Sequence, residues 1–493
     1  MPPYASALLT TAALALTHNP YHLKSTKTTH AQNRLSLSSR SQAVHPRLDA
    51  AANTAADASR PQAFLGSTFG SNSALFYRQG TLVLEDGTRL RGVSFGAEVD
   101  VKGELVFTTA MCGYPESLTD PSYRGQLLVM TYPIIGNYGV PEDDVDEHGL
   151  PLAFESLDGA VNVAALIVSD YSHHHSHWNS DRSLSQWLTQ QKVPALYGID
   201  TRLLTKKIRE RGALKANIEF DPPVAKLGGA PEPPTFVDSN ARNLVAEVSI
   251  KEPRTFGKGN RWKVLAVDCG IKVNILRSLV SRGCEVTLVP WDTPLTPLMA
   301  DYDGLFLSNG PGDPGKLSLV ISHVKELVDA QLSGAAPTTP LFGICLGNQL
   351  LGSAAGASTF KLPFGNRGVN QPVLNLLNGR CFITSQNHGY ALDPTNLPDG
   401  WVPAFQNRND GSNEGIMHTT RPWMTAQFHP EAKAGPSDTF FLFDLFTDCM
   451  ANPEEGQSSI ARSLRLGAYT PPEPKPLKKV LLLGSGGLSI GQA

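Results

Sequence analysis

The chain has 493 residues, of which 41% are hydrophobic and 18% are charged, and its formal net charge is −3. This composition is typical of a soluble protein with two to four domains, and the charge argues against binding to nucleic acid or to an anionic membrane surface. Its six cysteines are scattered without a CxxC pair, which argues against a disulfide scaffold and a cysteine-rich zinc site. No apolar run is long enough to cross a bilayer.

The first 48 residues contain no Asp or Glu, five Lys or Arg and twelve Ser or Thr. A basic, hydroxylated and acid-poor segment is typical of an organelle transit peptide. The apolar stretch at 5–16 has no preceding Lys or Arg, which counts against a secretory signal. We therefore expect residues 1–70 to be a disordered targeting leader for an organelle, the mitochondrion before the plastid, with the cytosol left open.

A smaller mixed α/β domain is predicted over residues 74–215. GTLVLEDGTRLRGVSFG (80–96) has strand alternation, and its Asp-Gly pair marks a hairpin turn. VNVAALIVSDY (161–171) is predicted to be a buried strand and SLSQWLTQQKV (183–193) a helix. A linker and connecting segment, rich in Pro and Gly in its first part, is predicted over 216–260.

The pattern changes at residue 262, where strand-like and helix-like segments begin to alternate. The predicted strands start at Trp262, Cys284, Gly304 and Pro340, and the predicted helices cover 271–283 and 319–332. Alternation at this spacing predicts a parallel sheet covered by helices on both faces, with a site outside the carboxyl ends of the strands. We assign this domain to 261–450, a linker to 451–476, and the start of a truncated further domain to 477–493.

Cys345 lies between a strand-like run and a helix-like run in LFGICLGNQLLG. Gly343 and Gly347 permit the sharp turn of a nucleophile elbow with the cysteine at its apex. A helix N-terminus and a nearby histidine would lower the pKa of such a thiol, and the N–H of Leu346 would face a developing oxyanion. Because free cysteine is among the most buried residue types, the pattern by itself leaves a packing role equally open.

The segment AQFHPEA (426–432) carries a histidine and a glutamate two positions apart. We predict a short strand that ends at His429, so that Glu431 faces the same way on an extended chain. Glu431 would then hold His429 in one tautomer while His429 acts as a base. Most isolated His-x-Glu pairs are structural. This pair indicates catalysis only together with the Cys345 turn in the same domain.

Two more segments offer polar or glycine-rich turns. SNGPGDP (308–314) follows a predicted strand and is either an ordinary turn or a nest of N–H groups for an anion or oxyanion. No GK[ST] follows it, which excludes a Walker-type phosphate loop. SQNHGYA (385–391) interrupts a strand pattern and either presents groups that recognise an amide or forms a hairpin.

These four segments together resemble the class I, triad-type glutamine amidotransferases, and more closely the glutaminase subunit of carbamoyl-phosphate synthase. The resemblance covers residues 76–450. GYPESLTDPSYRGQLLVMTYPIIGNYG (113–139) resembles the N-terminal domain of that subunit, and FGNRGVNQP (364–372) and SQNHGYAL (385–392) look like the same family. KKVLLLGSGGLSIGQA (478–493) resembles the start of the synthetase portion, which implies a synthetase fused C-terminally. The implied fold is a class I amidotransferase domain preceded by a smaller mixed α/β domain.

The resemblance implies that Cys345 attacks the side-chain amide of glutamine, that His429 passes a proton to the leaving ammonia, and that Glu431 orients His429. Water then hydrolyses the glutamyl thioester. The oxyanion N–H groups and the glutamine pocket are implied at Gly310, Gly312, Leu346, Gln349, Asn387, Gly389 and Tyr390. The ammonia passes to a synthetase that uses bicarbonate and ATP with Mg, for arginine and urea or for pyrimidine synthesis. No cofactor or metal is implied in this segment.

Two positions depart from the family pattern. Ala110 stands where many bacterial members have a serine that contacts glutamine. Asn348 stands where many have a histidine, and it resembles the ammonia-using branch, whose members have lost the cysteine. These departures keep open the alternative of a weak or inactive glutaminase-like module that docks onto and regulates the synthetase, whereas the retained Cys345 favours activity. The N-terminal domain disfavours a different cysteine hydrolase on the same fold, such as a γ-glutamyl hydrolase.

The histidine-rich run HHHSH at 173–177 is the one segment that suggests a metal by composition. Adjacent histidines cannot all reach one ion without strain, and no carboxylate or cysteine spacing accompanies them. We interpret the run as a polar loop.

Overall fold

The computed structural model describes residues 78–220, 234–453 and 455–466, which belong to one compact unit of the chain. The predicted leader, the Pro- and Gly-rich part of the first linker and the segment that resembles a synthetase lie outside these ranges. Within them, no helix is both long enough and apolar enough to cross a membrane.

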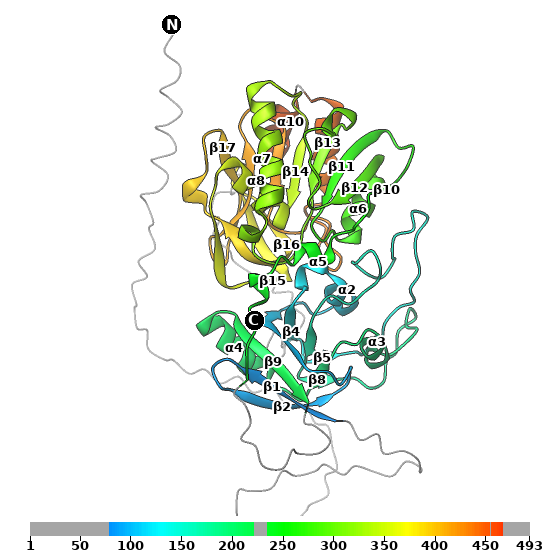
Figure 1. Ribbon diagram of the computed structural model, residues 1–493. Coiled ribbons are helices and arrows are strands. Elements are labelled where there is room, and N and C mark those ends of the chain that lie inside the picture. The colour runs from blue at the N-terminus through cyan, green and yellow to red at the C-terminus, as the bar shows by residue number, and fades with distance from the viewer. Residues whose placement is uncertain (1–77, 221–233, 454, 467–493) are drawn as a thin grey trace, which may run out of the picture. The chain divides into compact units, whose positions relative to one another are not determined.

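The N-terminal part of the described chain contains a closed β-barrel with the strand order β1-β2-β8-β6-β4-β3-β9 (Figure 1). Its elements are β1 (Gln79–Leu84), β2 (Arg89–Ser94), β3 (Val101–Thr108), α2 (Tyr114–Thr119), η1 (Pro121–Tyr123), β4 (Gln126–Met130), β5 (Ile134–Ile135), β6 (Ala165–Ile167), β7 (Asp170–Tyr171), α3 (Leu184–Gln190), β8 (Ala195–Tyr197), α4 (Thr201–Arg211) and β9 (Leu214–Phe220).

The barrel strand β4 is buried on both sides. Along β4, Leu127 and Val129 pack into one hydrophobic cluster, while Leu128 and Met130 pack into another that includes residues of α2 and α3. The predicted hairpin is confirmed, because β1 and β2 pair antiparallel on either side of a turn in which Gly87 has a φ of 84°. The predicted helix at 183–193 is confirmed as α3.

The C-terminal part contains a ten-stranded sheet with the order β10-β12-β11-β13-β14-β19-β18-β17-β15-β16. Its elements are η2 (Ser239–Ala241), α5 (Val245–Val248), β10 (Arg254–Phe256), β11 (Trp262–Asp268), α6 (Val273–Val280), β12 (Cys284–Pro290), η3 (Met299–Asp301), β13 (Gly304–Leu307), η4 (Pro314–Lys316), α7 (Ser318–Ser333), β14 (Leu341–Ile344), α8 (Leu346–Ala355), β15 (Thr359–Asn375), β16 (Cys381–Leu392), η5 (Pro394–Asn396), β17 (Trp401–Asn407), β18 (Asn413–His418), β19 (Trp423–Ala426), α9 (Phe441–Ala451) and α10 (Gly456–Arg465).

The parallel strands of this sheet, β12, β11, β13, β14 and β19, are covered on both faces. Val264 and Ala266 of β11 pack with α6, α9 and α10, whereas Leu265 and Val267 pack with α7 and α8. A strand buried on both sides reads as a continuous apolar run, which is the pattern of the sequence here. The predicted α/β amidotransferase fold is therefore confirmed.

Two predicted linkers contain regular structure. The segment predicted as a linker over 451–476 is wrong in its first half, because α10 lies there and buries Ile460 and Leu464 against the core. Those two apolar residues are four positions apart, so they share one helix face. The connecting segment predicted over 216–260 begins inside β9 and contains β10, an edge strand of the large sheet. Both elements are short and depend on the core they pack against.

Candidate active site

Cys345 occupies a strained turn between β14 and α8. Its φ is 55° and its ψ is −103°, a conformation that is costly for a residue with a side chain. A Cβ on Gly343 would lie 2.6 Å from the carbonyl oxygen of Gly347, and a Cβ on Gly347 would lie 2.1 Å from that of Leu307. Only glycine fits on either side, so the turn has the geometry of the predicted nucleophile elbow.

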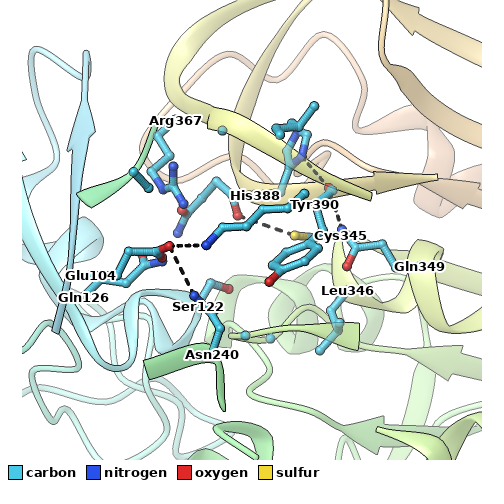
Figure 2. A pocket seen from close by; sticks show the side chains of 18 of the residues that line it. Glu104, Ser122, Gln126, Asn240, Cys345, Leu346, Gln349, Arg367, His388 and Tyr390 are labelled. Atoms are coloured by element: carbon cyan, nitrogen blue, oxygen red, sulfur yellow. Dashed lines mark hydrogen bonds and ion pairs between the residues drawn. The ribbon is translucent and has the colours of Figure 1, made fainter. Parts of the chain in front are cut away.

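The cavity at Cys345 is lined by all seven residues that the sequence predicted for the oxyanion site and glutamine pocket (Figure 2). They come from the loop after β13, from the start of α8 and from β16: Gly310, Gly312, Leu346, Gln349, Asn387, Gly389 and Tyr390. The Cys345 sulfur lies 3.6 Å from the carbonyl oxygen of Asn387. Their roles toward glutamine stay predictions.

Polar residues of the barrel and of β15 line the same cavity, and sequence analysis missed them (Figure 2). Glu104 of β3 accepts hydrogen bonds from Lys361 Nζ at 2.6 Å, Gln126 Nε2 at 3.0 Å and Asn240 Nδ2 at 3.2 Å. Lys361 is 257 residues from Glu104 in the chain, so no local pattern could pair them. The cavity is thus closed by side chains from both halves of the described chain.

The inference that a glutamine-contacting serine is missing at Ala110 stays a prediction. Ala110 lines two neighbouring cavities and does not line the cavity at Cys345. The barrel serine that does line it is Ser122, whose hydroxyl also accepts a hydrogen bond of 3.0 Å from Asn309 Nδ2. The other departure, Asn348, is fully buried and bonds to Thr425 and Gln427. These hydrogen bonds connect α8 to β19 and the residue after it. Asn348 lines neither the cavity at Cys345 nor the cavity at His429.

His429 and Glu431 form the predicted pair, with 2.6 Å between His429 Nδ1 and Glu431 Oε1, and both are buried. The predicted strand is wrong: β19 ends at Ala426, His429 makes an isolated bridge with Ser385, and Glu431 lies in a turn. An ionised carboxylate fixes the proton on Nδ1 and leaves Nε2 as the basic nitrogen. Within the described residues Nε2 is buried and makes no hydrogen bond, so it is free to take a proton.

Lys272, in the turn before α6, completes this side of the site and was not predicted. Its Nζ donates to Glu431 Oε1 and to the carbonyl of Ala432, each at 2.9 Å. Burial opposes ionisation of Glu431, but Lys272 and His429 outweigh it and lower the pKa of that carboxyl to about 2. Glu431 is therefore charged at neutral pH and able to stabilise an imidazolium at His429.

The expectation of a lowered pKa for the Cys345 thiol is wrong. Burial, the carboxylate of Asp120 and that of Glu431 raise the pKa of the Cys345 thiol, and the N–H of Leu346 only partly offsets them. The resting nucleophile is thus a neutral thiol that needs a base during the reaction.

Cys345 and His429 come from neighbouring parallel strands. Ile344 of β14 pairs with Ala426 of β19, and the N–H of Cys345 donates to the carbonyl of Ala426 at 2.8 Å. Asn387 lines the cavity that contains Cys345 and the adjoining one that contains His429. Both side chains thus leave the carboxyl ends of adjacent strands, where doubly wound sheets place their sites.

In the described ranges no group of three or more His, Cys, Asp or Glu side chains could hold a metal ion. Of the histidine-rich run, His175 contacts the hydroxyl of Ser180 at 2.6 Å.

Both halves of the described chain match known protein families. Residues 82–218 match the carbamoyl-phosphate synthase small chain, CPSase domain, and residues 265–449 match glutamine amidotransferase class-I. The described chain therefore contains a carbamoyl-phosphate synthase small-chain domain, which includes the β-barrel, and a class-I glutamine amidotransferase domain, which includes most of the ten-stranded sheet.

Similar proteins are much longer than this chain. The mitochondrial carbamoyl-phosphate synthase [ammonia] of Aquarana catesbeiana is 49% identical over 414 residues, which are 84% of this chain and 26% of that protein. The multifunctional protein pyr1-3 of Dictyostelium discoideum is 48% identical over 435 residues, 84% of this chain and 19% of that protein. Among solved structures, a putative GMP synthase component from Thermoplasma acidophilum is 26% identical, with a TM-score of 0.34, over 40% of this chain and 98% of that one.

Proposed function

We propose that this chain hydrolyses glutamine to glutamate and ammonia through a thioester on Cys345, and that the ammonia is used by a carbamoyl-phosphate synthetase. The observation that carries the proposal is the strained Cys345 turn in one cavity with the seven predicted pocket residues. A packing cysteine needs neither a strained backbone nor a polar cavity.

Each step uses a group described above. His429 Nε2 takes the thiol proton, and the Cys345 sulfur then forms a bond to the amide carbon of glutamine. The N–H groups of Leu346 and Gly312 stabilise the oxyanion, and the protonated His429 gives its proton to the leaving ammonia. Water activated by His429 breaks the thioester, which releases glutamate and restores the thiol. Glu431 stays ionised throughout, because Lys272 holds it charged.

Covalent trapping tests this proposal. The chain is treated with a glutamine analogue that carries an electrophilic carbon, and the adduct is located by mass spectrometry of the whole protein and its peptides. We expect one adduct on Cys345, prevented by excess glutamine and lost in Cys345→Ala and His429→Ala. Cys112 and Cys381 are exposed thiols and serve as internal controls for non-specific labelling.

A second candidate is the docking module without glutaminase activity, because four of the similar proteins are named carbamoyl-phosphate synthase [ammonia]. A well-folded chain that gives no adduct on Cys345, alone and in the presence of a synthetase, would favour this candidate. An adduct that forms only with the synthetase would support glutamine hydrolysis in a pocket that its partner completes.

We also propose a synthetase domain of the same polypeptide as the partner, with ATP and Mg bound there, and the mitochondrion as the location. Support comes from the longer relatives, from the composition of residues 1–48 and from the segment at 478–493. Because similar proteins include mitochondrial synthases and pyr multifunctional proteins, the product is assigned to arginine and urea or to pyrimidine synthesis. Fusing residues 1–73 to a fluorescent protein and imaging cells tests the location.

A further inference from the structure

The barrel reaches the candidate glutaminase site through the short segment between α2 and η1. Asp120 caps η1, and its Oδ1 accepts a hydrogen bond of 2.9 Å from the N–H of Ser122. Its second oxygen, Oδ2, accepts one of 2.9 Å from the side-chain amide Nδ2 of Asn387, which is 267 residues away. Both side chains are buried, so this bond is shielded from water and from salt.

Asn387 is the residue through which Asp120 can act on the nucleophile. It lies on β16, and its carbonyl oxygen is the atom 3.6 Å from the Cys345 sulfur. Asn387 also lines both the Cys345 cavity and the His429 cavity, and Asp120 lines the latter with it. The bond from Asp120 therefore fixes the side chain of a residue whose backbone faces the reacting atom.

We propose that Asp120 is a positioning residue of the glutaminase: the barrel, through the Asp120–Asn387 bond, sets the place of the Asn387 carbonyl beside the Cys345 sulfur. This inference rests on the proposed function for its kinetic part. The barrel thus contributes one buried carboxylate, Asp120, whose charge acts on the nucleophile of the amidotransferase domain.

The effect of Asp120 on Cys345 can be distinguished from a packing effect because it acts partly through charge. Three carboxylates raise the pKa of the thiol, Asp120 from the barrel, Glu431 after β19 and Glu414 on β18, and the guanidinium of Arg367 on β15 interacts with it electrostatically. Asp120 is the largest of these charge effects on the pKa of Cys345, second only to burial. It is also the one that can be neutralised without changing the amidotransferase domain.

The test is the pH profile of Cys345 alkylation by iodoacetamide in the full 493-residue chain, read from the peptide that contains Cys345. Asp120→Asn keeps the size of the side chain and removes its charge, so we expect the midpoint to move down by about 0.5 to 1 pH unit. Asp393→Asn is the matched control. Asp393 caps η5 in the same Asp-Pro-Thr manner that Asp120 caps η1 in Asp-Pro-Ser, and it lines neither cavity.

Steady-state kinetics complete the test. We expect Asp120→Ala to raise the KM for glutamine about tenfold with a smaller effect on kcat, and to add less than about twofold to the loss in kcat/KM already caused by Asn387→Ala. A midpoint in Asp120→Asn no lower than that in Asp393→Asn would overturn the proposal. So would additive losses in the double variant.

Alkylation does not depend on turnover. A wild-type chain that fails to hydrolyse glutamine would count against the proposed function while the pH profile still decides on Asp120. If Asp120→Ala does not fold, the Asp120→Asn profile carries the test.

Discussion

The two sides of the candidate site are held in place by different forces. Around Cys345 the constraint is steric: the glycines two positions away on either side leave no room for a Cβ, one because of the turn itself and the other because of the Leu307 carbonyl. Around His429 the constraint is electrostatic and long-range: Lys272, 159 residues from Glu431 in the chain, neutralises the carboxylate that orients the histidine. The backbone of the nucleophile turn should therefore tolerate charge changes, whereas the arrangement of the base side should be sensitive to them.

The largest expected effect comes from removing the cation on the base side. Lys272→Met leaves Glu431 buried without its main counter-charge, so we expect the free energy of unfolding to fall by about 3–5 kcal/mol. Urea denaturation measures it. Lys325→Met is the control, because the Lys325–Asp329 pair has a similar distance of 3.0 Å but is exposed, and such pairs contribute at most about 1 kcal/mol. Equal losses of unfolding free energy in the two variants would contradict the claim that the base side is held by electrostatics.

At the Cys345 turn, we expect that one added methyl group disrupts the steric fit. Gly347→Ala would place a Cβ 2.1 Å from the carbonyl oxygen of Leu307, a backbone atom that cannot move freely. We expect a loss of about 1–3 kcal/mol in unfolding free energy and of about a hundredfold in kcat/KM, since the displaced turn misplaces Cys345. In Gly352→Ala, the control in the same helix, the nearest atoms belong to the side chain of Leu392, which can adjust. Glutaminase assays on both variants should differ; matching losses would contradict the steric account.

A smaller, pH-dependent effect is expected at Glu155, which lies beside the base-side charges. Burial raises the pKa of Glu155 to about 7, although Lys272 and Lys433 act in the opposite direction. Since the folded state binds this proton more tightly than the unfolded chain, the stability from this group is fully present below about pH 4.3 and is lost as the pH rises through 7. We therefore expect Glu155→Gln to be more stable than the wild type by about 2 kcal/mol at pH 8, and nearly equal to it at pH 5.

Thermal or urea unfolding at the two pH values decides this prediction. A variant that is destabilised equally at pH 5 and pH 8 would show that Glu155 acts only through its hydrogen bond to the N–H of Asn274. The pH dependence is the part that a purely structural role does not produce.

The smallest effects separate Ser122 from Ala110. Ser122 lines the Cys345 cavity, so we expect Ser122→Ala to raise the KM for glutamine about fivefold, the worth of roughly one hydrogen bond. Ala110 lies outside that cavity, and Ala110→Ser should change KM by less than about twofold. A lower KM in Ala110→Ser would instead support the inference that a side-chain contact to glutamine is missing at Ala110.

Much of the amidotransferase fold could be predicted from the sequence, because strands such as β11 are buried on both faces and read as uninterrupted apolar runs. The helices α6 and α7 followed from their spacing and from glycine after their last turns. Helix α10 and strand β10 were missed, since each is short and owes its structure to the core beneath it. The turn at Cys345 was predictable because the two glycines that permit it lie two positions away in the sequence.

By itself, the sequence predicted the nucleophile turn and the His429–Glu431 pair from short motifs with a local physical cause. It predicted the seven residues at the cavity through the resemblance to a known family. Only the tertiary structure decided that Lys272 keeps Glu431 ionised and that Glu104 and Lys361 form an ion pair at the cavity. It also decided that Asp120 accepts a hydrogen bond from Asn387. Those contacts join residues more than a hundred positions apart. Buried charges find their partners through the packing of whole domains, and no local pattern in the chain carries that information.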